Sequence, residues 1–209
     1  MAEIPLTFLS EDLKLAGVIH LPGATDRKIA GVVLCHPHPL YGGNMHNNVV
    51  VTVSRVLAER GIAAFRFNFR GVGSSEGSFD DGVGERDDLQ AAIAALAERP
   101  EVDPDRLGVM GYSFGGMVAL NTVRNLEHVR ALAAVSPVVA PGIMDSLSLP
   151  AYFICGTQDH VVSNELLSVE AEKMNPPGQV ELVPGVDHFW GGHEQSMANK
   201  VSAFFEGVL

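Results

Sequence analysis

The side chain best placed for nucleophilic chemistry is a serine between two glycines. Ser113 lies in residues 111–115 (GYSFG), after the apolar run 107–110 and before a segment with helical character. A strand, a sharp turn and a helix in this order expose a serine hydroxyl, and the glycines leave room for the turn. The helix dipole would then face an oxyanion formed at the serine. Such a pentapeptide can arise by chance, but this context predicts a serine nucleophile.

Two later loops carry the base and the acid that such a nucleophile needs. A base must accept the serine proton, and a third group must hold the tautomer of the base. Asp159 and His188 follow the apolar runs 151–155 and 180–183, so each is expected beyond the carboxyl end of a strand. The order serine, acid, histidine is that of α/β-hydrolases. We therefore predict a catalytic triad of Ser113, Asp159 and His188.

Neighbouring residues compete for these roles. Asp187 is the rival acid, but a carboxylate next to His188 in sequence would usually point away from it. His193 is the rival base, although His188 has the position directly after the last strand. Asp159 could instead cap a turn, as aspartate does readily. We assign His160 to the surface.

An oxyanion hole requires two backbone N–H donors. The first is expected from Phe114, directly after the nucleophile, and the second from the segment HPHPLYGG. The two prolines of that segment have no N–H to donate. The predicted second donor is therefore His38, with Leu40 as the alternative.

The same segment also suggests a metal site, made of Cys35, His36, His38 and His46. Adjacent residues on an extended strand point to opposite faces, so Cys35 and His36 are not expected to bind one ion. The sequence has no C-x-x-C or H-E-x-x-H motif, and no carboxylate lies between Cys35 and His46. We expect neither a metal nor another cofactor.

The elements that would position these residues alternate between strands and helices. Two short strands, 6–8 and 13–20, are expected to form an antiparallel hairpin. Continuous apolar runs such as 29–35 are typical of strands buried on both faces. Repeated β-α units predict a mostly parallel, doubly wound sheet with helices on both faces and a site beyond the carboxyl ends of its strands. The strands are expected at residues 6–8, 13–20, 29–35, 62–67, 107–110, 129–135, 151–155 and 180–183, and the helices at about 50–57, 85–99, after 113, 165–174 and from 195.

Composition and charge narrow the class of protein. A chain of 209 residues with 46% hydrophobic and 19% charged residues suits one globular domain, residues 1–209. The net charge of −11 argues against nucleic acid or an anionic membrane as a partner. We expect no signal peptide and no membrane span. Cys35 and Cys155 lie in apolar runs, and we expect two buried thiols in a cytoplasmic protein.

Three longer motifs accompany the serine pentapeptide: HPHPLYGGNM (36–45), RFNFRGVGSSEG (66–77) and PGVDHF (184–189). With them the chain resembles the α/β-hydrolase superfamily over essentially its whole length, and within it a branch of small uncharacterised bacterial hydrolases. The resemblance implies an eight-stranded sheet whose second strand is antiparallel, and the same triad. One departure is His36-Pro37 in place of the usual His-Gly, which leaves the second oxyanion donor open.

The region around the nucleophile is expected to be open. Many superfamily members insert a lid after the sixth strand, but residues 136–150 are too few to build a helical cap. A lidless site argues against a true lipase. Ordinary core packing is the alternative for every aromatic candidate for the acyl pocket. These candidates are Tyr41, Phe69, Phe79, Phe114 and Trp190.

The leading hypothesis is a lidless serine hydrolase that cleaves carboxylic esters of short or medium acyl chain through an acyl-enzyme. Its substrate would be a small molecule, and its state a monomer or a homodimer. A thioesterase or a small-peptide or amide hydrolase would use the same triad. From a different class, the chain could be a non-catalytic binding protein on a hydrolase scaffold.

Overall fold

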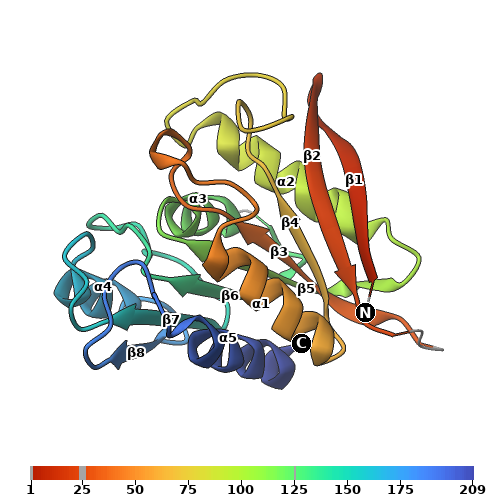
Figure 1. The fold of residues 1–209 in the computed structure, drawn as a ribbon. Coiled ribbons are helices and arrows are strands. Elements are labelled where there is room, and N and C mark those ends of the chain that lie inside the picture. Colours follow the sequence, from red (N-terminus) through yellow and green to blue (C-terminus); the bar gives the residue numbers. More distant parts are fainter. Residues whose placement is uncertain (1, 24–26, 125) are drawn as a thin grey trace.

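The computed structural model describes residues 2–23, 27–124 and 126–209. Eight strands form one sheet in the order β1-β2-β4-β3-β5-β6-β7-β8 (Figure 1). Strand β2 is antiparallel to both β1 and β4, and the remaining pairs are parallel. The strands are β1 (Ala2–Ser10), β2 (Leu13–Leu21), β3 (Ile29–Cys35), β4 (Ala63–Phe67), β5 (Val102–Tyr112), β6 (Val129–Val135), β7 (Ala151–Gly156) and β8 (Gln179–Val183).

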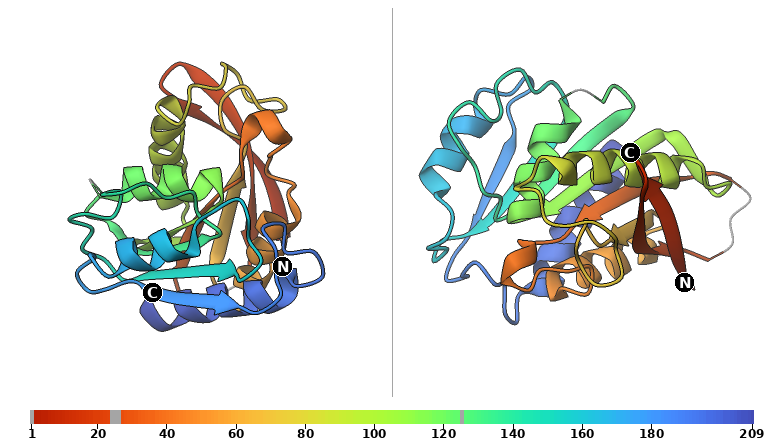
Figure 2. Two further views of the ribbon diagram at one scale, coloured as in Figure 1. Left: turned by 90° about the vertical axis from the view of Figure 1, so that its left-hand side faces the viewer. Right: turned by 90° about the horizontal axis from the view of Figure 1, so that it is seen from above.

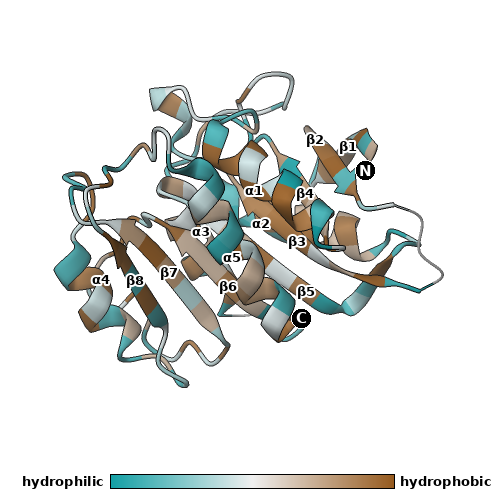
Figure 3. Cartoon of the chain, turned by 60° about the horizontal axis from the view of Figure 1, so that its bottom comes forward, coloured by the Kyte–Doolittle hydropathy of each residue, from teal (hydrophilic) through white to brown (hydrophobic). Residues whose placement is uncertain are grey.

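Helices cover both faces of the sheet (Figure 2). Helices α1 and α5 share one buried apolar cluster with the sheet, and α2, α3 and α4 share the other. The two clusters explain why the central strands are apolar on both sides, as the colouring of β3 and β7 shows (Figure 3). Within the described residues, no helix is long and apolar enough to cross a membrane. The helices are α1 (Asn48–Glu59), α2 (Gly84–Ala97), α3 (Phe114–Val123), α4 (Asn164–Ala171) and α5 (Glu194–Val208), with the short 3₁₀ turn η1 (Pro39–Tyr41).

The predicted fold class is confirmed: the sheet is eight-stranded, doubly wound and mostly parallel, and its second strand is antiparallel. Residues 136–150, all of them described, contain turns but no helix or strand, so no lid covers the sheet edge at this point. Strand β5 begins at Val102, earlier than the predicted run at 107. Its first part carries exposed polar residues, which give no apolar signal although Val102 pairs with Ile29 of β3.

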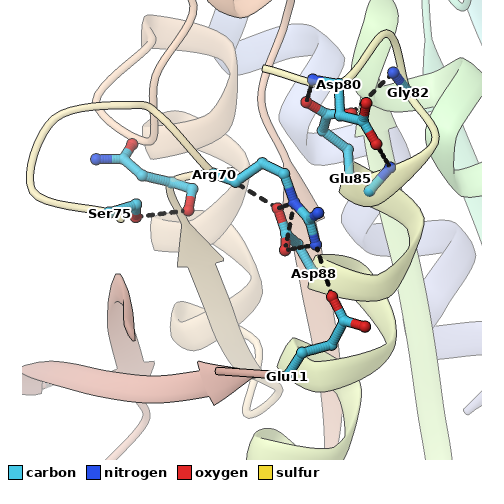
Figure 4. Close-up of polar contacts among 9 residues, drawn as sticks. Glu11, Arg70, Ser75, Asp80, Gly82, Glu85 and Asp88 are labelled. Carbon is cyan, nitrogen blue, oxygen red and sulfur yellow. Dashed lines mark hydrogen bonds and ion pairs between the residues drawn. The ribbon is translucent and has the colours of Figure 1, made fainter. Parts of the chain in front are cut away.

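A buried ion pair holds the loop between β4 and α2 (Figure 4). The Arg70 guanidinium donates to the Asp88 carboxylate, with Nε 3.1 Å from each oxygen and Nη2 2.8 Å from Oδ1. The backbone N–H of Arg70 donates to the same carboxylate at 2.9 Å. Asp88 is fully buried, whereas Glu11 lies at the exposed side of the guanidinium, 3.9 Å away. The loop that approaches the carboxyl ends of the strands is therefore tied to the start of α2.

We expect Asp88→Asn to lower the free energy of unfolding by about 3–5 kcal/mol, because the amide leaves a buried guanidinium without its counter-charge. Glu11→Gln removes the exposed carboxylate of the same cluster and is expected to cost at most about 1 kcal/mol. Urea unfolding of both variants measures the difference. Equal costs for the two variants would show that the buried pair does not hold this loop.

Candidate active site

Ser113 lies on a strained turn between β5 and α3. Its φ of 55° and ψ of −116° are unusual for a residue with a side chain. Gly111 and Gly115 make the turn possible, since a Cβ at Gly111 would overlap the carbonyl of Gly115, and a Cβ at Gly115 would overlap the carbonyl of Cys35. The turn places the serine hydroxyl beyond the carboxyl ends of the parallel strands.

The structure brings Ser113, His188 and Asp159 into one chain of hydrogen bonds. The Ser113 hydroxyl is 3.0 Å from Nε2 of His188, and Nδ1 of His188 is 2.8 Å from Oδ2 of Asp159. The other carboxylate oxygen accepts the N–H groups of Val161 and Val162 at 2.9 and 3.1 Å. In the neutral imidazole the proton therefore belongs on Nδ1, facing the carboxylate. Nε2 is then free to accept the serine proton.

The environment of Asp159 keeps its carboxylate ionised. Burial by itself raises the pKa of Asp159, but hydrogen bonds from His188 and from the N–H groups of Val161 and Val162 outweigh it and lower the pKa below its usual value. A carboxylate in this state can stabilise a positive charge on the adjacent imidazole.

The residues that compete for the roles of acid and base lie outside the hydrogen-bonded triad. Asp187 is exposed, and its Oδ1 accepts the N–H of Phe189 at 3.0 Å. His193 is exposed and precedes the first turn of α5. His160 is also exposed. Among the described residues, Asp187 makes no hydrogen bond to His188, and His193 makes none to Ser113.

His36 fixes the segment that follows β3, a role that the sequence did not reveal. The side chain is fully buried, and its Nε2 accepts the N–H of Phe69 at 3.1 Å. The proton must then be on Nδ1, which donates to the carbonyl of Pro37 at 2.7 Å. Burial lowers the pKa of His36 to about 4, although the bond to Pro37 opposes this shift. A neutral histidine thus links the ends of β3 and β4 directly before His38.

The two predicted oxyanion donors, the N–H groups of His38 and Phe114, come from two neighbouring segments. His38 caps the turn η1, and its Nδ1 accepts the N–H of Leu40 at 3.2 Å. The amide of Leu40 is therefore already bonded, which counts against it as an oxyanion donor. Among the described residues, no partner is recorded for the N–H of His38 or of Phe114. The ring of His38 packs on that of Phe114, with centroids 4.9 Å apart, so the two segments are in contact.

The buried state of His36 predicts a pH-dependent stability. In the unfolded chain its pKa is about 6.5, so above this pH neither state is protonated. At lower pH the unfolded chain binds the proton first, and His36 alone lowers the free energy of unfolding by about 1.4 kcal/mol per pH unit down to about pH 4. His36→Gln keeps an acceptor for Phe69 but cannot be protonated. Urea unfolding should give this variant a shallower acid dependence than the wild type, and parallel curves would contradict the assignment.

A pocket of about 410 Å³ contains the hydroxyl of Ser113 and the ring of His188. Tyr41, Val161 and Phe189 line it from three different loops, and their exposed fractions are 88%, 60% and 67%. The rim of this open pocket is therefore apolar. On the side of the HPHPLYGG segment, the wall is completed by Pro37, His38, Gly42, Gly43 and Asn47.

The structure corrects the predicted pocket lining. Phe69 and Trp190 are both fully buried, Phe69 in the cluster under α2 and α3 and Trp190 in the cluster under α1 and α5. Each side chain extends the buried apolar cluster on its side of the sheet. Large aromatic side chains are commonly buried in this way. Phe79 packs on His38 and faces a neighbouring hollow rather than the pocket of Ser113. Tyr41 does line that pocket.

The cysteines and histidines considered as metal ligands are not arranged around one site in the described part of the chain. Cys35 and Cys155 are free and buried, and burial raises the pKa of Cys155 to about 12. Within the described part of the chain, no group of three or more His, Cys, Asp or Glu residues is arranged to hold a metal ion.

Comparison with known proteins gives consistent results. Residues 79–204 match the model of the Dienelactone hydrolase family. The uncharacterized protein RP471 of Rickettsia prowazekii is 32% identical over 178 residues, covering 80% of this chain and 74% of the relative. The uncharacterized protein YfhR of Escherichia coli is 28% identical over 195 residues, and the match covers 79% of this chain but only 65% of that protein. A crystal structure from Xanthomonas campestris, described as an a/b serine hydrolase without lid, has a TM-score of 0.86 at 29% identity and covers 99% of this chain and 94% of its own.

Proposed function

Because the chain belongs to the dienelactone hydrolase family and shares its fold with α/β serine hydrolases, we propose that it hydrolyses carboxylic esters of short or medium acyl chain. The observation that carries this proposal is the hydrogen-bonded chain of Ser113, His188 and Asp159 at an open, apolar pocket. The Ser113 hydroxyl lies within hydrogen-bond reach of its base, and that base lies within hydrogen-bond reach of the carboxylate that orients it.

The proposed reaction has two steps. Ser113 Oγ attacks the ester carbonyl while Nε2 of His188 takes the hydroxyl proton, and the same proton then passes to the leaving alcohol. Water, deprotonated by His188, attacks the acyl-enzyme, and His188 returns that proton to Ser113 Oγ as the acid leaves. Asp159 holds the tautomer of His188 and stabilises the imidazolium. The free N–H groups of His38 and Phe114 are the proposed donors to the oxyanion.

The pocket supports a neutral, apolar acyl group of limited length. No lysine, arginine, aspartate or glutamate is among the described residues that line it. Tyr41, Val161 and Phe189 offer apolar contact at the rim, but no lid closes over a long chain. Each methylene that these side chains cover contributes about 0.8 kcal/mol, and methylenes beyond the rim remain in water.

Labelling with a fluorophosphonate, followed by mass spectrometry of the peptides, tests whether Ser113 is the nucleophile. Failure to modify Ser113 in the folded protein would reject the serine hydrolase and favour a binding protein. The leaving group is tested by kcat/KM for an ester, a thioester and an anilide of one acyl group, and the chain length by esters from acetate to palmitate. We expect the ester to be preferred and the rate to decline for the longest chains. A preference for the thioester or the anilide would move the proposal to that class.

A further inference from the structure

Two buried residues near the triad have backbone conformations that their side chains disfavour. Ser136 has a φ of 43° and Trp190 a φ of 62°. Positive φ is costly for residues other than glycine, and for a bulky side chain it is a genuine outlier. Both side chains are fully buried, and they bond to each other: the indole N–H of Trp190 donates to the Ser136 hydroxyl oxygen at 3.1 Å.

Ser136, Trp190 and the triad residues lie directly after, or in the loops that follow, four neighbouring strands. Ser113 follows β5, Ser136 follows β6, Asp159 follows β7, and the loop with His188 and Trp190 follows β8. The strands β5, β6, β7 and β8 are adjacent in this order in the sheet (Figure 1). Each of the loops that follow β5, β6, β7 and β8 therefore brings at least one polar side chain to the same edge of the sheet.

Ser136 is held between β6 and β7 by its backbone. Its N–H donates to the carbonyl of Ile154 at 2.8 Å, which fixes it beside the strand that leads to Asp159. The hydroxyl accepts from Trp190 and can donate its own proton once. Hydrogen bonding from Ser136 is among the causes that lower the pKa of Asp159, and it also opposes the raised pKa of Cys155, so the hydroxyl lies near both side chains. Trp190 thus donates to Ser136 on one side of this edge, and His188 donates to the carboxylate of Asp159 on the other.

Trp190 lies two residues after His188 in the sequence, so its bond to Ser136 acts on the loop that carries the histidine. The histidine loop is consequently held to β7 and its loop in two ways, once by the bond between Asp159 and His188 and once through Ser136, which accepts from Trp190 and donates its N–H to Ile154 of β7. We propose that Ser136 and Trp190 are positioning residues that orient the Asp159 carboxylate and set the distance of His188 from Ser113. This inference rests on the proposed function, since it assigns a role relative to that triad.

A role in core packing alone gives different expectations. Packing would require the volume of the indole and the methylene of the serine, but not the hydrogen bond between them. Ser136→Ala and Trp190→Phe remove that bond and keep most of the volume. The matched control is Ser202→Ala, because Ser202 is a fully buried serine of α5 whose hydroxyl has no hydrogen-bond partner among the described residues.

The test compares these variants in ester hydrolysis and in the rate of inactivation by the fluorophosphonate. Removing a partner that orients a functional group typically costs about 10- to 100-fold. We expect Ser136→Ala and Trp190→Phe each to lower kcat and the inactivation rate by about this factor, with KM within about twofold. The double variant should be no slower than the slower single variant, because both changes remove the same bond. Ser202→Ala should behave like the wild type.

Two spectroscopic signals report on the network without a substrate. The proton between Nδ1 of His188 and Asp159 gives a low-field ¹H NMR resonance, which should move upfield in Ser136→Ala and remain in place in Ser202→Ala. Trp190 is the only tryptophan of the chain, so its fluorescence should shift to shorter wavelength in Ser136→Ala as the indole N–H loses its acceptor. If Ser136→Ala does not fold, Ser136→Gly removes the hydroxyl and also the cost of the positive φ.

The possible outcomes separate the two proposals. If the fluorophosphonate does not label Ser113 in the wild type, the proposed function fails. If the wild type is labelled but folded variants of Ser136 and Trp190 keep its kcat, inactivation rate and low-field resonance, the proposed function stands and the positioning role is wrong. A lower stability with unchanged kcat would likewise overturn the positioning role and leave packing.

Discussion

Ser113→Ala is expected to lower kcat for ester hydrolysis by about 10⁴-fold or more. The substitution removes the oxygen that would form the acyl-enzyme. The remaining groups can only hold the ester and polarise its carbonyl for attack by water. Steady-state kinetics on the preferred ester measures the loss, and fluorophosphonate labelling of the variant should disappear.

The same substitution should leave the fold intact. Alanine at position 113 experiences the same positive φ as serine, and the glycines that surround the turn are unchanged. The substitution removes one hydroxyl from a residue that is 7% exposed, so we expect a change in unfolding free energy of about 1 kcal/mol or less. Binding of the ester, measured as a dissociation constant with the inactive variant, should remain within a few-fold of KM. Retained turnover would show that another residue is the nucleophile.

The sequence was most informative where its signal was local. The strands buried on both faces are continuous apolar runs, and a serine, an acid and a histidine that follow three such runs in order define where three loops meet. For this reason a mostly parallel, doubly wound sheet and the meeting of Ser113, Asp159 and His188 at its edge could both be predicted, whereas the order of the strands was not. The start of β5 could not, because its exposed polar residues pair through the backbone, which the side-chain pattern does not record.

The orientation of individual side chains was less predictable. Trp190 and Phe69 lie close in sequence to functional loops, but each turns into a core instead of the pocket. His36 and Ser136 act through partners that are distant in the chain, Phe69 in one case and Trp190 in the other. A single sequence does not show such pairs. A histidine between a buried strand and a proline, as at position 36, is the one available hint of a structural role.

Asp159→Asn is the second change with a large expected effect. The carboxylate can only accept the proton of His188 Nδ1, whereas an asparagine can also present its N–H₂ to that atom. The imidazole would then carry its proton on Nε2, where it cannot accept the proton of Ser113. We expect kcat to fall by about 10⁴-fold, because the geometry is kept while the tautomer is wrong.

Asp187→Asn is the matched control, since it makes the same chemical change one residue before His188. Asp187 is exposed and its carboxylate accepts only the N–H of Phe189 among the described residues, a bond that the asparagine oxygen can also accept. Its kcat should therefore stay within about twofold of the wild type. The two variants carry the same change in charge, so a general electrostatic effect would slow both, whereas control of the tautomer slows Asp159→Asn alone. The reverse result, with a slow Asp187→Asn and an active Asp159→Asn, would transfer the acid role to Asp187.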